Sequence, residues 1–102
     1  MNEWINVIAV SALPEGERHL TMAKGHPILI FNLEGNFYAI EDCCTHQGLP
    51  LSDGELQGNE ITCPFHGAKF NIITGEVTEP PAFENLITFE TRVIEGMLQI
   101  LI

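Results

Sequence analysis

Positive charge is scarce in this 102-residue sequence. Four Lys and Arg stand against 14 Asp and Glu, which gives a formal net charge of −10 at pH 7. Nucleic acid is therefore a disfavoured partner, because its phosphates would be repelled. The same charge favours brief docking onto basic protein surfaces, where opposite charge speeds the encounter.

Long apolar runs and paired cysteines are also missing. No run reaches about 18 apolar residues, so we expect no membrane span. Residues 1–4 lack the basic and then apolar pattern of a signal peptide. Three Cys is an odd count, and two of them belong to a motif described below, so a disulfide framework is not expected. These features predict a soluble cytoplasmic protein.

The sequence has no convincing amphipathic helix, and short strand patterns alternate with turn signals. Glu34-Gly35-Asn36 and Ile94-Glu95-Gly96 look like hairpin connections. We predict one all-β domain over residues 1–102, an antiparallel β sandwich or barrel. The expected strands are 5–10, 18–22, 28–33, 37–41, 60–62, 69–71, 86–93 and 97–102.

Two short segments carry the chemistry. Cys44-Thr45-His46 is followed by sixteen residues (47–62) and then by Cys63-Pro64-Phe65-His66. Two thiolates and two imidazoles can hold one tetrahedral zinc. They can also hold a two-iron cluster, with both Cys on one iron and both His on the other. The ligand types alone leave both alternatives open.

The residues around these ligands favour iron. Cys-Thr-His, the run Cys63-Pro64-Phe65-His66-Gly67-Ala68-Lys69-Phe70 and Thr74-Gly75 resemble the Rieske iron–sulfur proteins. The resemblance implies one [2Fe-2S] cluster, with Cys44 and Cys63 on one iron and His46 and His66 on the other. It also implies a loop-rich cluster-binding subdomain, about 42–74, inserted in a basal β domain. Glu79-Pro80-Pro81 resembles the proline-rich loop that covers the cluster in this family.

Cys43 leaves one ambiguity. Cys43-Cys44-Thr45-His46 contains both C-x-H and C-x2-H, so spacing alone allows either cysteine as the ligand. The family pattern selects Cys44. Cys43 is then expected to be a small buried apolar residue or a free thiol.

The resemblance also bears on the redox potential. Rieske centres span roughly −150 to +300 mV, against about −400 mV for plant-type ferredoxins. The high-potential members carry a disulfide beside the cluster, where this chain has Leu49 and Phe65, and Ser and Tyr hydroxyls, where it has Ala68 and Phe70. Without these donors the added electron is less stabilised, so we expect a low potential.

The leading functional hypothesis is a Rieske-type ferredoxin, an electron carrier without catalytic residues. By resemblance, it would take electrons from a flavin-containing NAD(P)H reductase and pass them to a terminal oxygenase. The first alternative is a small Rieske-like subunit of a nitrite reductase-type enzyme. The second is a zinc-stapled interaction domain, although C-x-H is unusually tight for structural zinc.

Overall fold

The computed structural model describes residues 2–45 and 48–102, and it is built almost wholly of antiparallel strands. One short 3-10 helix, η1 (Val10–Ala12), follows the first strand. The strands are β1 (Trp4–Ala9), β2 (Arg18–Ala23), β3 (His26–Leu33), β4 (Asn36–Glu41), β5 (Glu55–Gln57), β6 (Glu60–Thr62), β7 (Lys69–Asn71), β8 (Val77–Glu79), β9 (Thr88–Phe89), β10 (Thr91–Ile94) and β11 (Met97–Leu101). The predicted all-β fold class is confirmed.

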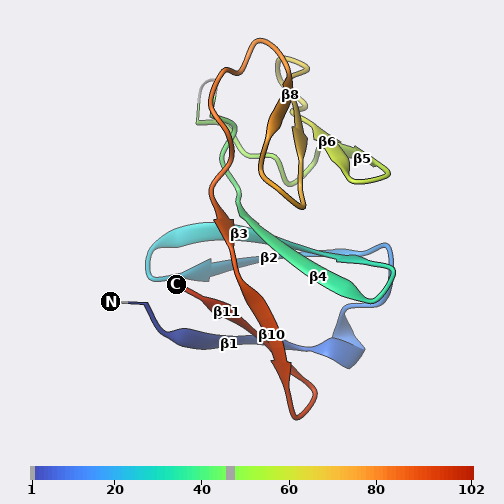
Figure 1. Cartoon of the computed structure of the whole chain (residues 1–102), viewed down its shortest axis with the longest axis vertical. Helices are drawn as coiled ribbons and strands as arrows, with labels where there is room; N and C mark the ends of the chain where they lie inside the picture. Colours follow the sequence, from blue (N-terminus) through green and yellow to red (C-terminus); the bar gives the residue numbers. More distant parts are fainter. Residues whose placement is uncertain (1, 46–47) are drawn as a thin grey trace.

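The strands form three sheets, ordered β1-β11-β10, β2-β3-β4-β9 and β5-β6-β7-β8. The first two make up the basal part of the molecule, and the third lies at its opposite end (Figure 1). The third sheet extends to Glu79, so β8 lies beyond residue 74. In the described part of the chain, no helix is long and apolar enough to cross a membrane.

Tight turns join several strands, and their backbones explain their residues. Leu33 pairs with Asn36 around Glu34 and Gly35, whose φ values are 54° and 86°. The Glu95-Gly96 turn between β10 and β11 has φ values of 50° and 77°. Two successive left-handed residues match the twist of a two-residue hairpin, and glycine adopts this conformation without strain. Both predicted hairpins are therefore confirmed.

The prediction of one strand over 86–93 is wrong. The chain changes sheets at Glu90: β9 pairs with β4, whereas β10 pairs with β11. Leu86 belongs to neither strand, and its N–H donates to the Gly75 carbonyl. The sequence prediction also lacked the three-residue strands β5 and β8.

β3 separates two hydrophobic cores. Its residues 28–32 are all buried, and alternate side chains point to opposite faces of the sheet. Ile28 and Ile30 face the basal core, which consists of Leu13, Ala23, Ile28, Ile30, Ala39, Leu98 and Ile100. Leu29 and Phe31 face the upper core, which consists of Leu29, Phe31, Ile40, Cys44, Leu51, Ile61, Cys63, Ala68, Phe70, Ile72, Ala82 and Leu86. The upper core therefore joins the basal sheet to the segments that carry the motif.

Candidate metal centre

The first predicted ligand segment is a tight loop that begins at Cys44. The Cys44 carbonyl accepts a hydrogen bond from Gly48 N–H at 2.7 Å, and the Cys44 N–H donates to the Leu49 carbonyl at 2.7 Å. Gly48 has a φ of 71°, a left-handed conformation that favours glycine. These two bonds hold the backbone on both sides of the cysteine. His46, the other predicted ligand of this segment, lies outside the described residues.

The second segment repeats the same backbone pattern. The Cys63 carbonyl accepts from Gly67 N–H at 3.0 Å, and the Cys63 N–H donates to the Ala68 carbonyl at 2.7 Å. Gly67 has a φ of 79°, and a Cβ added there would meet nothing within 4 Å. The turn itself therefore explains this glycine. Each cysteine thus bonds to the residues four and five positions later, so the two loops are matched units.

Burial separates the sulfur side of the site from the nitrogen side. Cys44 and Cys63 are each 1% exposed and both belong to the upper core. His66 follows Cys63 by three residues but is exposed. The structure therefore places both cysteines in one core and leaves the second loop's histidine at the surface. Among the residues that the structure describes, no group of three His, Cys, Asp or Glu side chains converges on a point.

Other elements hold the first loop in place. The Leu51 N–H donates to Asp42 Oδ1 at 2.7 Å, and Asp42 is one of two buried polar residues in the described part. Arg18, on β2, donates Nη1 to the carbonyls of Ser52 at 3.0 Å and Gly54 at 2.7 Å. Its guanidinium also lies 5.2 Å from the centre of the Phe31 ring. Sequence reasoning missed these supports, because bonds to backbone carbonyls leave no pattern in the sequence.

A third segment reaches the first loop after β8. The Thr45 hydroxyl donates to the Glu84 carbonyl at 2.7 Å. This segment includes the Pro80–Pro81 peptide bond, which is cis, and the buried Ala82. Phe83 at its tip is 88% exposed. The proline-rich segment is thus tied to the loop that contains Cys44.

Cys43 differs from the neighbouring Cys44 in its surroundings. It is half-buried, and its sulfur lies 3.9 Å from the position of a Cβ built on Gly48. Burial, followed by the nearby carboxylates of Glu41 and Asp42, raises the pKa of the Cys43 thiol. A raised pKa keeps the thiol protonated at neutral pH, so Cys43 is a poor nucleophile.

The chemistry of this donor set fits a two-iron cluster. Two thiols from matched loops lie in one apolar core, where thiolates can bind one iron away from water. The exposed imidazole of His66 suits the second iron. When bound, such a cluster supplies reversible uptake and release of one electron.

Comparison with known proteins decides the family. Residues 3–90 match the family model described as the Rieske [2Fe-2S] domain. The chain belongs to the Rieske family. This membership confirms the predicted cofactor, one Rieske-type [2Fe-2S] cluster, and rules against the zinc alternative.

Several relatives of this Rieske protein have names that state a role. The chain is 40% identical over 98 residues to ferredoxin CarAc of Metapseudomonas resinovorans, covering 94% of this chain and 92% of that protein. It is 35% identical over 94 residues to the ferredoxin component of a naphthalene 1,2-dioxygenase system of Pseudomonas aeruginosa, covering 92% and 89%. These relatives are ferredoxin components, and the prediction of an electron carrier instead of a catalytic subunit is confirmed.

Solved structures agree with this assignment. The chain superposes with a TM-score of 0.88 and 38% identity on a structure described as the complex of reduced oxygenase and oxidized ferredoxin in carbazole 1,9a-dioxygenase, covering 95% of this chain and 91% of that one. A ferredoxin of Sphingomonas yanoikuyae B1 superposes with a TM-score of 0.87 at 27% identity, covering 96% and 97%. The Rieske ferredoxin fold is therefore shared along nearly the whole chain.

Proposed function

We propose that this Rieske ferredoxin carries single electrons from a flavin-containing, NAD(P)H-dependent reductase to a terminal oxygenase in the cytoplasm. The observation that carries the proposal is the asymmetry of the site, with Cys44 and Cys63 buried and His66 exposed. The dioxygenase-system ferredoxins among its relatives support the choice of oxygenase as acceptor.

The proposed ligands are those that the motif predicts. Cys44 and Cys63 bind one iron, and His46 and His66 bind the other. Two neutral imidazoles leave the cluster less negative than four thiolates would, so an electron is accepted more easily. The histidine side is the proposed exit, because a short path to the partner's acceptor runs through exposed His66.

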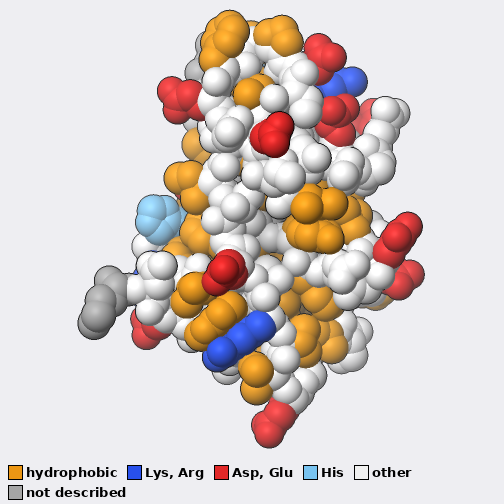
Figure 2. All heavy atoms as spheres, in the orientation of Figure 1, with side chains coloured by type: hydrophobic (Ala, Val, Ile, Leu, Met, Phe, Trp, Pro, Cys, Tyr) orange, Lys and Arg blue, Asp and Glu red, His pale blue; other side chains and the backbone are white. Residues whose placement is uncertain are grey.

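Exposed apolar side chains lie next to this exit in the sequence and on the proline-rich segment. Phe65 is 55% exposed beside His66, and Phe83 is 88% exposed on the proline-rich segment. Exposed apolar side chains that gather into one patch mark contact sites. Apolar side chains gather at this end of the molecule, with mainly acidic groups and some basic charge on its flanks (Figure 2). We infer that a partner with an apolar patch and a basic rim docks here.

The structure also bears on the proposed low potential. Ala68 and Phe70 are both fully buried in the upper core with the two cysteines. Neither side chain has a hydroxyl to donate to a reduced cluster. The added charge is therefore less stabilised, which supports a potential near the lower end of the Rieske range.

Reconstitution tests the proposal. The holoprotein is reduced and mixed in a stopped-flow instrument with the oxygenase of carbazole 1,9a-dioxygenase or of naphthalene 1,2-dioxygenase. Re-oxidation of the cluster that saturates with oxygenase concentration is expected for at least one of them. A cluster that is intact by absorption and paramagnetic resonance, yet stays reduced with both, would overturn the proposal.

A further inference from the structure

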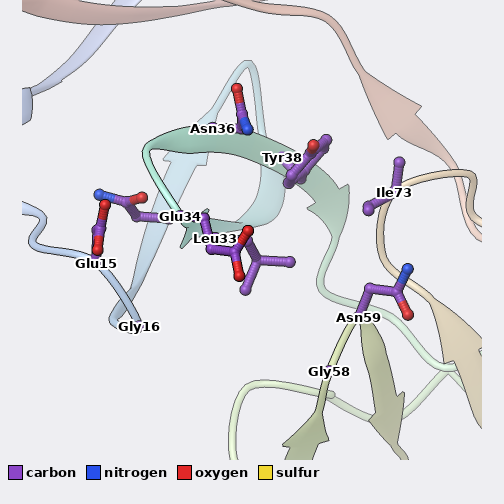
Figure 3. A pocket seen from close by; sticks show the side chains of 10 residues that line it. Glu15, Gly16, Leu33, Glu34, Asn36, Tyr38, Gly58, Asn59 and Ile73 are labelled. Carbon is purple, nitrogen blue, oxygen red and sulfur yellow. The ribbon is translucent and has the colours of Figure 1, made fainter.

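A groove crosses the side of the molecule between the basal sheet and the third sheet. We call it the waist groove, and it has a volume of about 560 Å³. The β3–β4 hairpin supplies Leu33, Glu34 and Tyr38 to one wall, and Asn59 and Ile73 lie opposite (Figure 3). Among the residues that the structure describes, none of 44–45, 48–49, 63–68 or 79–86 lines it. The waist groove is therefore separate from the cluster-bearing loops and the proline-rich segment.

The walls combine apolar surface with carboxylates. Leu33, Tyr38 and Ile73 give the apolar part, and Ile73 is 40% exposed. Glu15 and Glu34 supply negative charge at one end. A second hollow of about 310 Å³ shares Tyr38 and Ile73 and includes Glu90. An apolar centre thus lies between carboxylates.

The carboxylates of the groove lack a cation from the chain. Lys and Arg are absent from the lining, and the one ion pair within residues 2–45 and 48–102 joins Lys24 to Glu3. Arg18 bonds the Ser52 and Gly54 carbonyls, and Arg92 lies 4.1 Å from the centre of the Trp4 ring. Since few basic side chains remain, a second copy of this chain is a poor source of the missing charge.

Hydrogen bonds hold the backbone turn at the acidic end of the groove. The buried Asn32 donates Nδ2 to the Leu13 carbonyl at 2.8 Å and accepts the Gly35 N–H at 2.9 Å, which fixes the β3–β4 turn. A Cβ built on Gly35 would lie 3.8 Å from Glu15 Oε1, so this carboxylate reaches the same turn as Glu34. Two like charges at one turn favour a cationic ligand, and the backbone of that turn needs no ordering when it binds.

We propose that the waist groove docks an arginine-bearing surface segment of a partner protein. The planar guanidinium suits Glu15 and Glu34, and its weaker hydration suits the apolar walls better than a lysine ammonium would. The arginine stem and an adjacent apolar side chain pack against Leu33, Tyr38 and Ile73. Such a contact holds the ferredoxin while its cluster-bearing end stays open to exchange electrons.

A peptide titration tests the groove directly. The ¹⁵N-labelled oxidised holoprotein is titrated with acetyl-Gly-Leu-Arg-Leu-Gly-amide, and with the same peptide carrying Gln for Arg. Saturable amide shifts at Leu33, Glu34, Asn59 and Ile73 are expected with the Arg peptide only. Shifts that are equal with the Gln peptide, or that scatter over other acidic surfaces, would overturn the proposal.

Matched charge variants provide the control. Glu15→Gln with Glu34→Gln should weaken peptide binding at least tenfold, whereas Glu3→Gln with Glu76→Gln, which removes the same charge elsewhere, should leave it unchanged. Equal weakening in both double variants would show non-specific attraction and reject the site. The wild type could also form dimers as its concentration rises, and the Glu15→Gln, Glu34→Gln variant could lose them. That result would reject a partner protein as the occupant and show that a second copy of this chain binds the groove.

A second measurement uses whole partners and rests on the proposed function. With the oxygenase or the reductase, the groove variant should raise KM and leave the electron-transfer rate at saturation unchanged. If the KM is unchanged with both partners and the peptide does not bind, the groove proposal is rejected and the proposed function stands. Absent electron transfer in the wild type instead counts against the proposed function.

Discussion

Arg18 Nη1 lies 2.7 Å from the Gly54 carbonyl oxygen, and this bond joins basal strand β2 to the segment that follows the first ligand loop. The same nitrogen also reaches the Ser52 carbonyl at 3.0 Å. One side chain therefore attaches the proposed metal centre to the basal domain at a point distant in sequence.

Arg18→Met keeps most of the apolar stem and removes both bonds. We expect the free energy of unfolding to fall by about 1 to 3 kcal/mol, because two backbone carbonyls lose their donor. Urea unfolding of the holoprotein, followed by cluster absorbance, measures this. Arg92→Met, which removes an exposed bond to Gln99 and the contact with the Trp4 ring, leaves no backbone carbonyl without its donor and should cost less. An equal urea midpoint for Arg18→Met and wild type would contradict the expectation.

Gly54→Ala should be severely destabilising. A Cβ there would lie 2.4 Å from the Thr62 carbonyl oxygen and 2.9 Å from that of Leu51, and both are backbone atoms. Overpacking against backbone costs about 3 kcal/mol or more. Gly58→Ala is the control: its Cβ meets open space, and only its φ of 62° adds strain of about 1 to 2 kcal/mol. The midpoint of thermal unfolding should be lower for Gly54→Ala than for Gly58→Ala, and the reverse order would refute the steric argument.

Replacing each of the adjacent cysteines distinguishes their roles. Cys44→Ser should lose the visible absorption of the cluster, because Cys44, like Cys63, is buried in the upper core. Cys43→Ser should keep it, because that side chain is half-buried and outside this core. Iron content and the reduced paramagnetic spectrum measure both outcomes. Retention of a normal cluster in Cys44→Ser would show that the ligand was assigned to the wrong cysteine.

Adding hydroxyls to the upper core should raise the redox potential. Ala68→Ser and Phe70→Tyr each place a donor at a fully buried position in the core that holds Cys44 and Cys63. A hydrogen bond to a charged group contributes about 1.5 to 3 kcal/mol, which is roughly 60 to 130 mV for one electron. Spectroelectrochemical titration measures the shift. Phe37→Tyr, at the basal core, should leave the potential unchanged, and an equal rise there would refute the local explanation.

Phe83 tests the docking end. Phe83→Ser should raise the KM for the oxygenase several-fold, because an apolar contact is lost, while stability and cluster spectrum stay as in wild type. Ile94→Ser removes an exposed apolar side chain from the basal end, where 45% of it is accessible. Its KM should not change. An unaltered KM in Phe83→Ser would place docking elsewhere.

The sequence predicted best what depends on local pattern. Strands 60–62 and 69–71 coincide with β6 and β7, and both hairpin turns lie where glycine follows glutamate. The prediction of one strand over 86–93 was wrong because residues favourable to a strand run through the whole segment. Only tertiary pairing decides that the chain changes sheets at Glu90.

The proposed site also has features that the sequence predicted and features that it did not. The two Cys and His motifs predicted the ligand segments, since those residue types are rare and chemically specific, and the assignment stays a prediction. The Thr45 bond to the Glu84 carbonyl and the Asp42 bond to Leu51 were not foreseen. Such bonds have a backbone atom as partner, and every residue provides one.

Strand order also has a consequence for the folding route. β5 to β8 pair strictly in chain order, so the third sheet needs only short loop closures. β1 instead pairs with β11, and Trp4 lies opposite Leu101 across nearly the whole chain. Closing so long a loop costs entropy and slows folding, so this pairing should form last. The cluster-bearing end can therefore take shape in a chain whose first strand is still unattached.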